Sequence, residues 1–186
     1  MHELTELANK YGSDKGSVHV FTEEIYGPLF QSKKEKPINI LEIGAGKVGG
    51  SHKMWKEYFT KGEVFCMDPF FLPDQLVTID ELESLGINII RGNQLNRADL
   101  LAAGKAAEGG YDIIIDDGAH MPDSIQLSVA VLFPYLKSGG YFIVEDLATA
   151  RRRGSDVHAV NENLRKLDTK NLMKEQKVSS SRQNLI

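Results

Sequence analysis

The chain has 186 residues, a net charge of -4, a hydrophobic content of 41% and one cysteine, Cys66. This length allows one substantial core, and no apolar run approaches the ~20 residues that a membrane-spanning helix needs. The acidic balance disfavours general nucleic-acid binding, which relies on a basic face to neutralise phosphates, and a single cysteine excludes an intrachain disulfide or a cysteine-rich zinc site.

Two helices are predicted ahead of the first strand. Residues 4–11 and 21–30 carry the helical patterns, and the segment 12–16, which contains two glycines, joins them. We interpret residues 1–36 as a helical cap and not as a separate domain.

Five short apolar segments follow, and helix-like stretches separate them. This alternation is typical of a parallel α/β sheet. Residues 48–60 and 123–136 have apolar positions at helical spacing and should pack on the sheet, with Trp55 in the core. The motif Lys137–Gly140 predicts a tight turn into the fifth strand. The predicted strands are residues 38–43, 63–67, 87–91, 111–116 and 141–145.

The character of the sequence changes after Asp146. Residues 156–177 can form one polar helix, residues 178–186 have little to hold them in place, and we find no good pair of strands within 151–186. The basic run Arg151–Arg153 is interpreted as a solvated loop. The C-terminal part, 148–186, is therefore predicted to be a divergent helical tail.

A glycine loop follows the first predicted strand. Gly44, Gly46 and Gly49 fit the pattern G-x-G-x-x-G, so a dinucleotide site has to be weighed, with Asp68 as the ribose-binding acid. Glu42 argues against that interpretation, because a dinucleotide site usually keeps an apolar residue there. A carboxylate beside the loop suits a ligand that carries an ammonium group and no pyrophosphate.

The glycine loop resembles motif I of class I S-adenosylmethionine-dependent methyltransferases. Further motifs, in the same order along residues 4–147, resemble the metal-dependent sugar O-methyltransferases that modify macrolides and related natural products, and more distantly the cephalosporin hydroxylase-like proteins. These motifs are Tyr11–Gly16 with His19, Met54–Trp55 with Tyr58–Phe59, Gly92–Gln94, Ile115–His120 and Glu145–Leu147. After Leu147 the sequence departs from that family.

The resemblance implies a magnesium ion held by Asp117, Glu145 and Asp146, with His120 as general base. Magnesium prefers oxygen ligands, and crossover rules place consecutive parallel strands near one another, which would bring these carboxylates together. Taken singly, Asp117 could cap the following helix and His120 could bond backbone groups. The expected cofactor-binding residues are Glu42, Gly44, Gly46, Asp68, Asn93, Gln94 and Asp116.

The expected fold is therefore a Rossmann-like parallel sheet of the class I methyltransferase type, in one domain over residues 1–186 with the cofactor-binding core at 37–147. The implied function is O-methylation of a hydroxyl on a sugar or small natural product, with S-adenosylmethionine and magnesium as cofactors. A cofactor-binding module without catalysis remains a second interpretation, because the tail departs from the family, and NAD-dependent oxidoreduction a third. We expect a cytoplasmic protein with no nucleic-acid or membrane partner; a homo-oligomer remains open.

Overall fold

The computed structural model describes residues 1–147 and 184–185. By its internal contacts the chain divides into two compact units, Met1–Arg91 and Gly92–Ile186. Each unit contains parallel strands and the helices that connect them, so the predicted alternation of strand and helix is confirmed. Within the described residues, no helix combines the length and apolar character that crossing a membrane requires.

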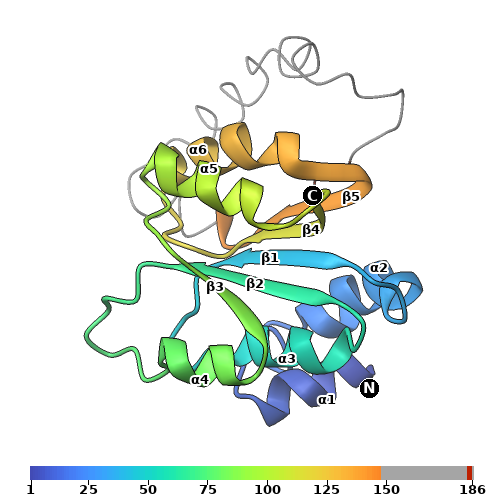
Figure 1. Cartoon of the computed structure of the whole chain (residues 1–186). Helices are drawn as coiled ribbons and strands as arrows, with labels where there is room; N and C mark the ends of the chain where they lie inside the picture. Colours follow the sequence, from blue (N-terminus) through green and yellow to red (C-terminus); the bar gives the residue numbers. More distant parts are fainter. Residues whose placement is uncertain (148–183, 186) are drawn as a thin grey trace. The chain divides into compact units, whose positions relative to one another are not determined.

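The first unit carries three parallel strands in the order β3-β2-β1, with bounds Asn39–Ile43 for β1, Glu63–Asp68 for β2 and Ile87–Arg91 for β3. Its helices α1 (Glu3–Lys10), α3 (Gly50–Tyr58) and α4 (Ile79–Ser84) lie on one side of these strands (Figure 1). Helix α4 occupies the helix-like stretch that the sequence indicated between the second and third strands.

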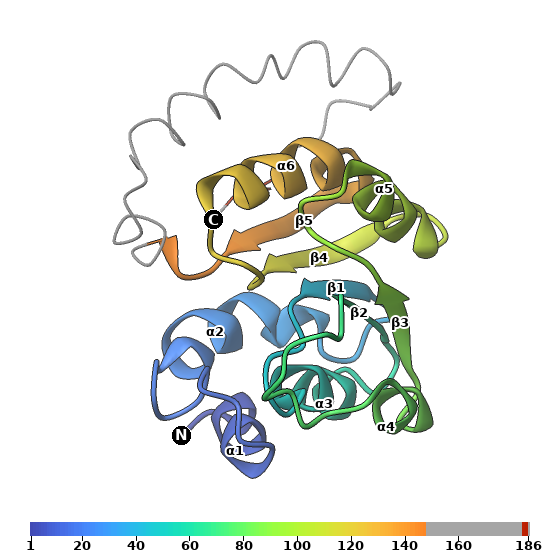
Figure 2. The ribbon, with the colours of Figure 1, turned by 90° about the vertical axis from the view of Figure 1, so that its left-hand side faces the viewer.

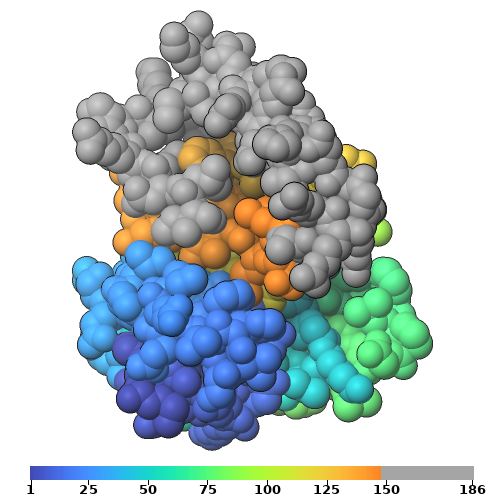
Figure 3. All heavy atoms as spheres, turned by 180° about the vertical axis from the view of Figure 1, so that it is seen from behind, coloured from blue at the N-terminus to red at the C-terminus, as the bar shows by residue number. Residues whose placement is uncertain are grey.

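The N-terminal cap has the two predicted helical segments, but the second one is irregular. It consists of a π-helical stretch, η1 (Thr22–Tyr26), followed by α2 (Gly27–Phe30) and the 3-10 turn η2 (Gln31–Lys33). Pro28 explains the irregularity, because it has no N–H to donate to the carbonyl four residues earlier. The N-terminal segments, drawn in blue, form most of the visible face of this unit in the space-filling view (Figure 3).

A cluster of aromatic side chains forms the core beneath the cap. The ring of Trp55 lies 5.3 Å from that of Tyr26 in an edge-on arrangement and 6.1 Å from that of Phe59. All three side chains are buried, as is Cys66 on β2. Gly50 allows the cap to approach α3 closely, because a Cβ atom there would lie 2.7 Å from the carbonyl oxygen of Tyr11. The core position predicted for Trp55 is therefore confirmed.

The second unit carries the strands β4 (Tyr111–Asp116), β5 (Leu136–Val144) and β6 (Asn184–Leu185), which pair in parallel in this order. The helices α5 (Arg97–Ala106) and α6 (Pro122–Leu132) lie side by side on one side of β4 and β5 (Figure 2), and a 3-10 turn, η3 (Phe133–Tyr135), leads into β5. Helix α5 occupies the helix-like stretch indicated between the third and fourth strands. The predicted proximity of the fourth and fifth strands is confirmed.

Two expectations for this unit are corrected. Lys137–Gly140 does not precede the fifth strand but bulges from it: Leu136 pairs with Tyr111, and pairing resumes between Tyr141 and Ile113. A Cβ atom on Gly140 would lie 2.9 Å from the carbonyl oxygen of Asp112, so the glycine permits the close approach of β4. The tail was expected to be unsupported at 178–186, yet residues 184–185 pair with β5 as β6. The helix predicted at 156–177 and the run Arg151–Arg153 lie outside the described residues.

Candidate functional site

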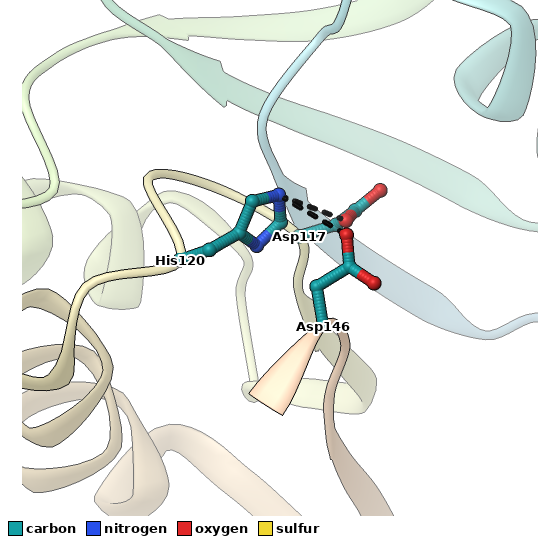
Figure 4. Close-up of side chains that lie close together, drawn as sticks. All are labelled: Asp117, His120 and Asp146. Carbon is teal, nitrogen blue, oxygen red and sulfur yellow. Dashed lines mark ion pairs between the residues drawn. The ribbon is translucent and has the colours of Figure 1, made fainter. Parts of the chain in front are cut away.

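Acidic side chains and a histidine meet where β4 and β5 end. One ligand atom each from Asp117, His120 and Asp146 lie within 4.8 Å of one another. Nε2 of His120 is 3.9 Å from Oδ1 of Asp117 and 3.6 Å from Oδ2 of Asp146, and the imidazole ring faces both carboxylates (Figure 4). Because β4 and β5 are parallel neighbours, residues that follow their carboxyl ends share one edge of the sheet.

The backbone of this cluster is strained. His120 has φ 51° and Asp146 has φ 56°, a left-handed conformation that residues with a side chain adopt uncommonly. Such conformations cost roughly 1–3 kcal/mol each and persist only where the surroundings enforce them. Strained conformations of this kind concentrate at functional sites, so the strain at His120 and Asp146 favours a functional role for this cluster.

Glu145 differs from its neighbours in burial. Its side chain is largely buried, whereas those of Asp117 and His120 are partly accessible, with 24% and 21% exposure. One carboxylate oxygen of Glu145 also lies within 4.8 Å of one of Asp117. Asp117 thus belongs to two groups of ligand atoms, whereas no such group among the described residues contains Glu145 together with Asp146. The carboxylates of Asp117 and Asp146 are hard oxygen donors of the kind that magnesium prefers, and Glu145 is a further such donor beside Asp117, so their chemistry fits the metal that the sequence implied.

Gln94 and Asp116 are turned inward and bond to each other. Nε2 of Gln94 donates to Oδ1 of Asp116 at 2.6 Å, and the hydroxyl of Ser128 donates to Oδ2. Burial raises the pKa of the Asp116 carboxyl, whereas the hydrogen bond from Ser128 lowers it. Both residues were expected to bind cofactor; in this unit their side chains serve a buried hydrogen-bond network.

Asn93 shapes the loop after β3. Its side-chain oxygen accepts a hydrogen bond from the N–H of Leu95 at 2.9 Å, and its own N–H donates to Asp99 at 2.8 Å. The residue is exposed, so its side chain combines a turn-forming bond with access to solvent.

The glycine loop of the first unit begins where β1 ends. Gly44 and Gly46 have φ 98° and 60°, conformations that favour glycine, and a Cβ atom on Gly46 would meet no atom within 4 Å. The loop is tied to Asp68 at the end of β2, because the N–H of Ala45 donates to Oδ2 of that carboxylate at 2.9 Å. Open space therefore lies beside a loop whose shape is fixed by the predicted ribose-binding acid.

Asp68 accepts two more hydrogen bonds. The N–H of Phe70 lies 2.6 Å from Oδ1, and the side-chain amide of Gln75 lies 3.2 Å from the same atom. Gln75 also donates to the carbonyl oxygen of Gly46 at 3.3 Å. The side chain of Gln75 thus joins the loop after β2 to the glycine loop, a role that sequence reasoning missed.

Glu42 lies in a buried polar cluster. Its side chain is fully buried, accepts a 2.7 Å hydrogen bond from the indole of Trp55 and lies 3.7 Å from Nε2 of His52. Nζ of Lys15, which is 1% exposed, lies 3.4 Å from Oε1 of Glu42. The sequence predicted that the carboxylate of Glu42 would face the ammonium group of a ligand. In this structure it faces the ammonium group of Lys15. Lys15 stands within the motif Tyr11–Gly16, but the motif gave no signal of its partner.

No protein-family profile matches the chain. Among curated proteins, it is 34% identical over 155 residues to mycinamicin VI 2''-O-methyltransferase from Micromonospora griseorubida, and 36% identical over 155 residues to 8-demethyl-8-(2-methoxy-alpha-L-rhamnosyl)-tetracenomycin-C 3'-O-methyltransferase from Streptomyces olivaceus. Each match covers 80% of this chain and 37% of the relative, so the chain spans well under half the length of these relatives.

A solved structure gives the same result. The MycE methyltransferase from the mycinamycin biosynthetic pathway, in complex with Mg, SAH and mycinamycin VI, matches with a TM-score of 0.71 and 32% identity, over 82% of this chain and 41% of the other. The Rossmann-like methyltransferase fold is therefore confirmed, and the homologues are macrolide and sugar O-methyltransferases, as the motifs indicated.

Proposed function

We propose that this homologue of macrolide and sugar O-methyltransferases transfers the methyl group of S-adenosylmethionine to a hydroxyl of a sugar or small glycosylated natural product. The observation that carries the proposal is the cluster of Asp117, His120 and Asp146 at the ends of two neighbouring strands. The named activities of the relatives support the reaction class, and the complex of MycE with Mg and SAH supports the two cofactors.

The cofactor would lie against the glycine loop. Gly44 and Gly46 let a ligand approach the backbone, and Asp68 would accept hydrogen bonds from ribose hydroxyls, because an ionised carboxylate is an acceptor only. Glu42 would either accept from the ammonium group of the cofactor's methionine moiety or hold the side chain of Lys15 in place. Asn93, Gln94 and Asp116 would border the cofactor or shape its surroundings.

Asp117, Glu145 and Asp146 would hold the magnesium ion. When bound, the ion would supply Lewis acidity that makes a substrate hydroxyl easier to deprotonate. Without such help the proton transfer from a sugar hydroxyl to histidine is steeply uphill. The pKa of such a hydroxyl is not far from the ~15.7 of water, that of a free histidine is ~6.5, and each pKa unit costs about 1.4 kcal/mol.

His120 would act as the general base. As the hydroxyl oxygen forms a bond to the methyl carbon, the bond from that carbon to sulfur breaks, its electron pair stays on sulfur, and the hydroxyl proton passes to the imidazole. The adjacent carboxylates of Asp117 and Asp146 would stabilise the imidazolium that results. A positioned base contributes about 10²- to 10⁴-fold to such a step.

A second candidate is a module that binds S-adenosylmethionine without productive catalysis. The observation that favours it is coverage, because the chain matches only 37% of the length of its curated relatives. Such a module would keep the glycine loop with Asp68 and would bind the cofactor without transferring its methyl group.

The deciding experiment supplies the chain with methyl-labelled S-adenosylmethionine, magnesium and a panel of glycosides. Transfer of label to a glycoside, lost in the presence of a chelator, is the expected result. Tight binding of S-adenosylhomocysteine by calorimetry without transfer across a broad panel would favour the module. Binding of NAD in preference to S-adenosylhomocysteine would overturn the cofactor assignment.

A further inference from the structure

A buried hydrogen-bond network lies directly behind the cluster at the ends of β4 and β5. It consists of the side chains of Gln94, Asp116 and Ser128, which are at most 5% exposed. We propose that Gln94 and Asp116 are positioning residues, which hold the turn 117–120 and the start of the segment after β5 so that Asp117, His120 and Glu145 can act together. The inference rests on the proposed function, and it gives these two residues a role other than contact with the cofactor.

The amide of Gln94 works in two directions. Its nitrogen donates to Oδ1 of Asp116 at 2.6 Å, while its oxygen accepts the N–H of Ala119 at 2.9 Å. The reverse orientation would set the amide oxygen against a carboxylate and the NH₂ group against another donor, so this network admits one orientation. The side chain therefore links β4 to the middle of the turn that carries Asp117 and His120.

The amide nitrogen of Gln94 has two acceptors within the network. Besides Asp116, the hydroxyl oxygen of Ser128 lies 3.4 Å away. Both amide hydrogens are thus directed into the protein, and a donor role toward the adenine of a cofactor would require breaking a buried bond. Leaving a buried polar group without its partner costs roughly 1–3 kcal/mol, or more where the group is charged.

Asp116 connects both strand ends. Its carboxylate accepts hydrogen bonds from Gln94 and Ser128, and its Oδ1 atom lies 3.4 Å from the N–H of Gly118 in the turn. Its main-chain carbonyl oxygen accepts the N–H of Glu145 at 2.9 Å. One residue therefore fixes the segment that carries Asp117 and the segment that carries Glu145.

The network of Gln94, Asp116 and Ser128 restrains a turn whose backbone is strained. His120 has φ 51°, and a residue with a side chain keeps such a conformation only when its surroundings over-determine it. The bond from Ala119 to Gln94 restrains the residue immediately before His120. Groups that orient metal ligands in this way typically change metal affinity about 10- to 100-fold when they are removed.

The test compares Gln94→Leu with the unaltered chain in three measurements. These are the affinity for Mn²⁺ by calorimetry, the affinity for S-adenosylhomocysteine, and the hydrogen exchange rate of the Ala119 amide. The expected results are a loss of Mn²⁺ affinity of about 10- to 100-fold, little change in S-adenosylhomocysteine affinity, and faster exchange at Ala119. Asn96→Ala is the matched control: it removes the N-cap of α5, at a cost of about 1 kcal/mol, without touching the network.

A swapped pair supplies the second variant. Gln94→Glu alone places two carboxylates in contact and is expected to lose Mn²⁺ affinity. Adding Asp116→Asn reverses the polarity of the bond, so that Asn at 116 donates to Glu at 94, which still accepts from Ala119. Two contacts of 3.4 Å are given up, the one from Gly118 to Asp116 and the one from Gln94 to Ser128. We expect the double variant to recover most of the lost affinity, a coupling that independent sites do not show.

Two results would overturn the inference. One is weaker binding of S-adenosylhomocysteine in Gln94→Leu with unchanged Mn²⁺ affinity, which would make Gln94 a cofactor contact. The other is unchanged exchange at Ala119. If the unaltered chain binds no Mn²⁺ at all, the proposed metal site fails, whereas faster exchange at Ala119 in Gln94→Leu would still support the positioning of the turn.

Discussion

Nε2 of His120 lies 3.6 Å from Oδ2 of Asp146, although the two residues follow different strands. The contact exists because β4 and β5 are parallel neighbours and the backbone turns sharply after each of these two strands. The contact joins a candidate base to a candidate metal ligand. Because the two residues touch, a single substitution at either one can affect both proton transfer and metal binding. Each variant therefore needs a measurement that is specific to one role.

Replacing His120, the proposed base, should slow the reaction without lowering the affinity for the metal. We predict that His120→Gln lowers kcat by about 10²- to 10⁴-fold, because it removes the proton acceptor. Calorimetry with Mn²⁺ should give nearly the same affinity as the unaltered chain. Retained turnover at neutral pH would exclude His120 as the base.

Replacing a metal ligand should have the opposite signature. Asp117→Asn removes a charged oxygen donor, so we predict a large loss of Mn²⁺ affinity with nearly unchanged affinity for S-adenosylhomocysteine. Asp123→Asn, in the exposed first turn of α6, is the matched control. Equal activity of the unaltered chain with and without a chelator would refute the metal requirement.

Gln75 should compete with the cofactor for Asp68. A carboxylate offers about four acceptor positions, and the N–H groups of Ala45 and Phe70 with the amide of Gln75 take three of them. Two ribose hydroxyls need two, and only the Gln75 donor belongs to a side chain that can move away. We predict that Gln75→Ala binds S-adenosylhomocysteine about 2- to 10-fold more tightly, given that one hydrogen bond contributes ~0.5–1.5 kcal/mol.

Asp68→Asn and Gln31→Ala complete that test. Asp68→Asn should weaken S-adenosylhomocysteine binding, and Gln31→Ala, a change of the same kind in the cap, should leave it unchanged. Weaker binding in Gln75→Ala would show that Gln75 assists the ligand, and unchanged binding in Asp68→Asn would remove the ribose assignment.

The buried pair of Lys15 and Glu42 should matter for stability. Removing one partner leaves a buried charge without compensation, so Lys15→Met is expected to lower the free energy of unfolding by about 3–5 kcal/mol. Lys10→Met, which breaks the exposed pair with Glu57, should change it little. Urea unfolding followed by circular dichroism measures both. The double variant Lys15→Met with Glu42→Gln, which keeps an oxygen acceptor for the indole of Trp55, should recover much of the loss. Equal effects of the two lysine variants would contradict the buried ion pair.

The thiol of Cys66 should be unreactive in the folded chain. Burial raises its pKa well above the ordinary value, and the charges of Glu42 and Asp68 raise it further, so the thiol stays protonated at mildly alkaline pH. Because the thiolate is the reactive form, we predict negligible reaction with a disulfide reagent at pH ~8 and full reaction in guanidinium chloride. Rapid labelling without denaturant would place Cys66 outside a stable core.

The sequence predicted the strands well, because their apolar segments have clear limits. The run Ile113–Ile115 continues to Asp116, where β4 ends, and crossover rules then placed Asp117 near the residues after β5. Pairing of short polar segments is less readable. Residues 184–185 are too short a segment to show an apolar run or an alternation, so the pairing of β6 with β5 could not be foreseen.

The roles of individual polar residues were harder to predict than their neighbourhood. Gln94 and Asp116 were expected at the site and lie directly behind it, because hydrogen bonding between distant segments decides which way each side chain turns. Lys15 is a second example, since a lysine is rarely buried and the sequence did not indicate that Glu42 would lie beside this one. Sequence patterns locate strand ends, whereas tertiary contacts decide which polar atoms face the ligand.

The metal site is tested most directly by the anomalous difference map of a crystal of this chain grown with Mn²⁺ and S-adenosylhomocysteine. We predict one manganese peak within coordination distance of carboxylate oxygens from Asp117, Glu145 and Asp146, with His120 close by but not required as a ligand. A map with no peak at these carboxylates, or with its manganese held elsewhere, would contradict the account.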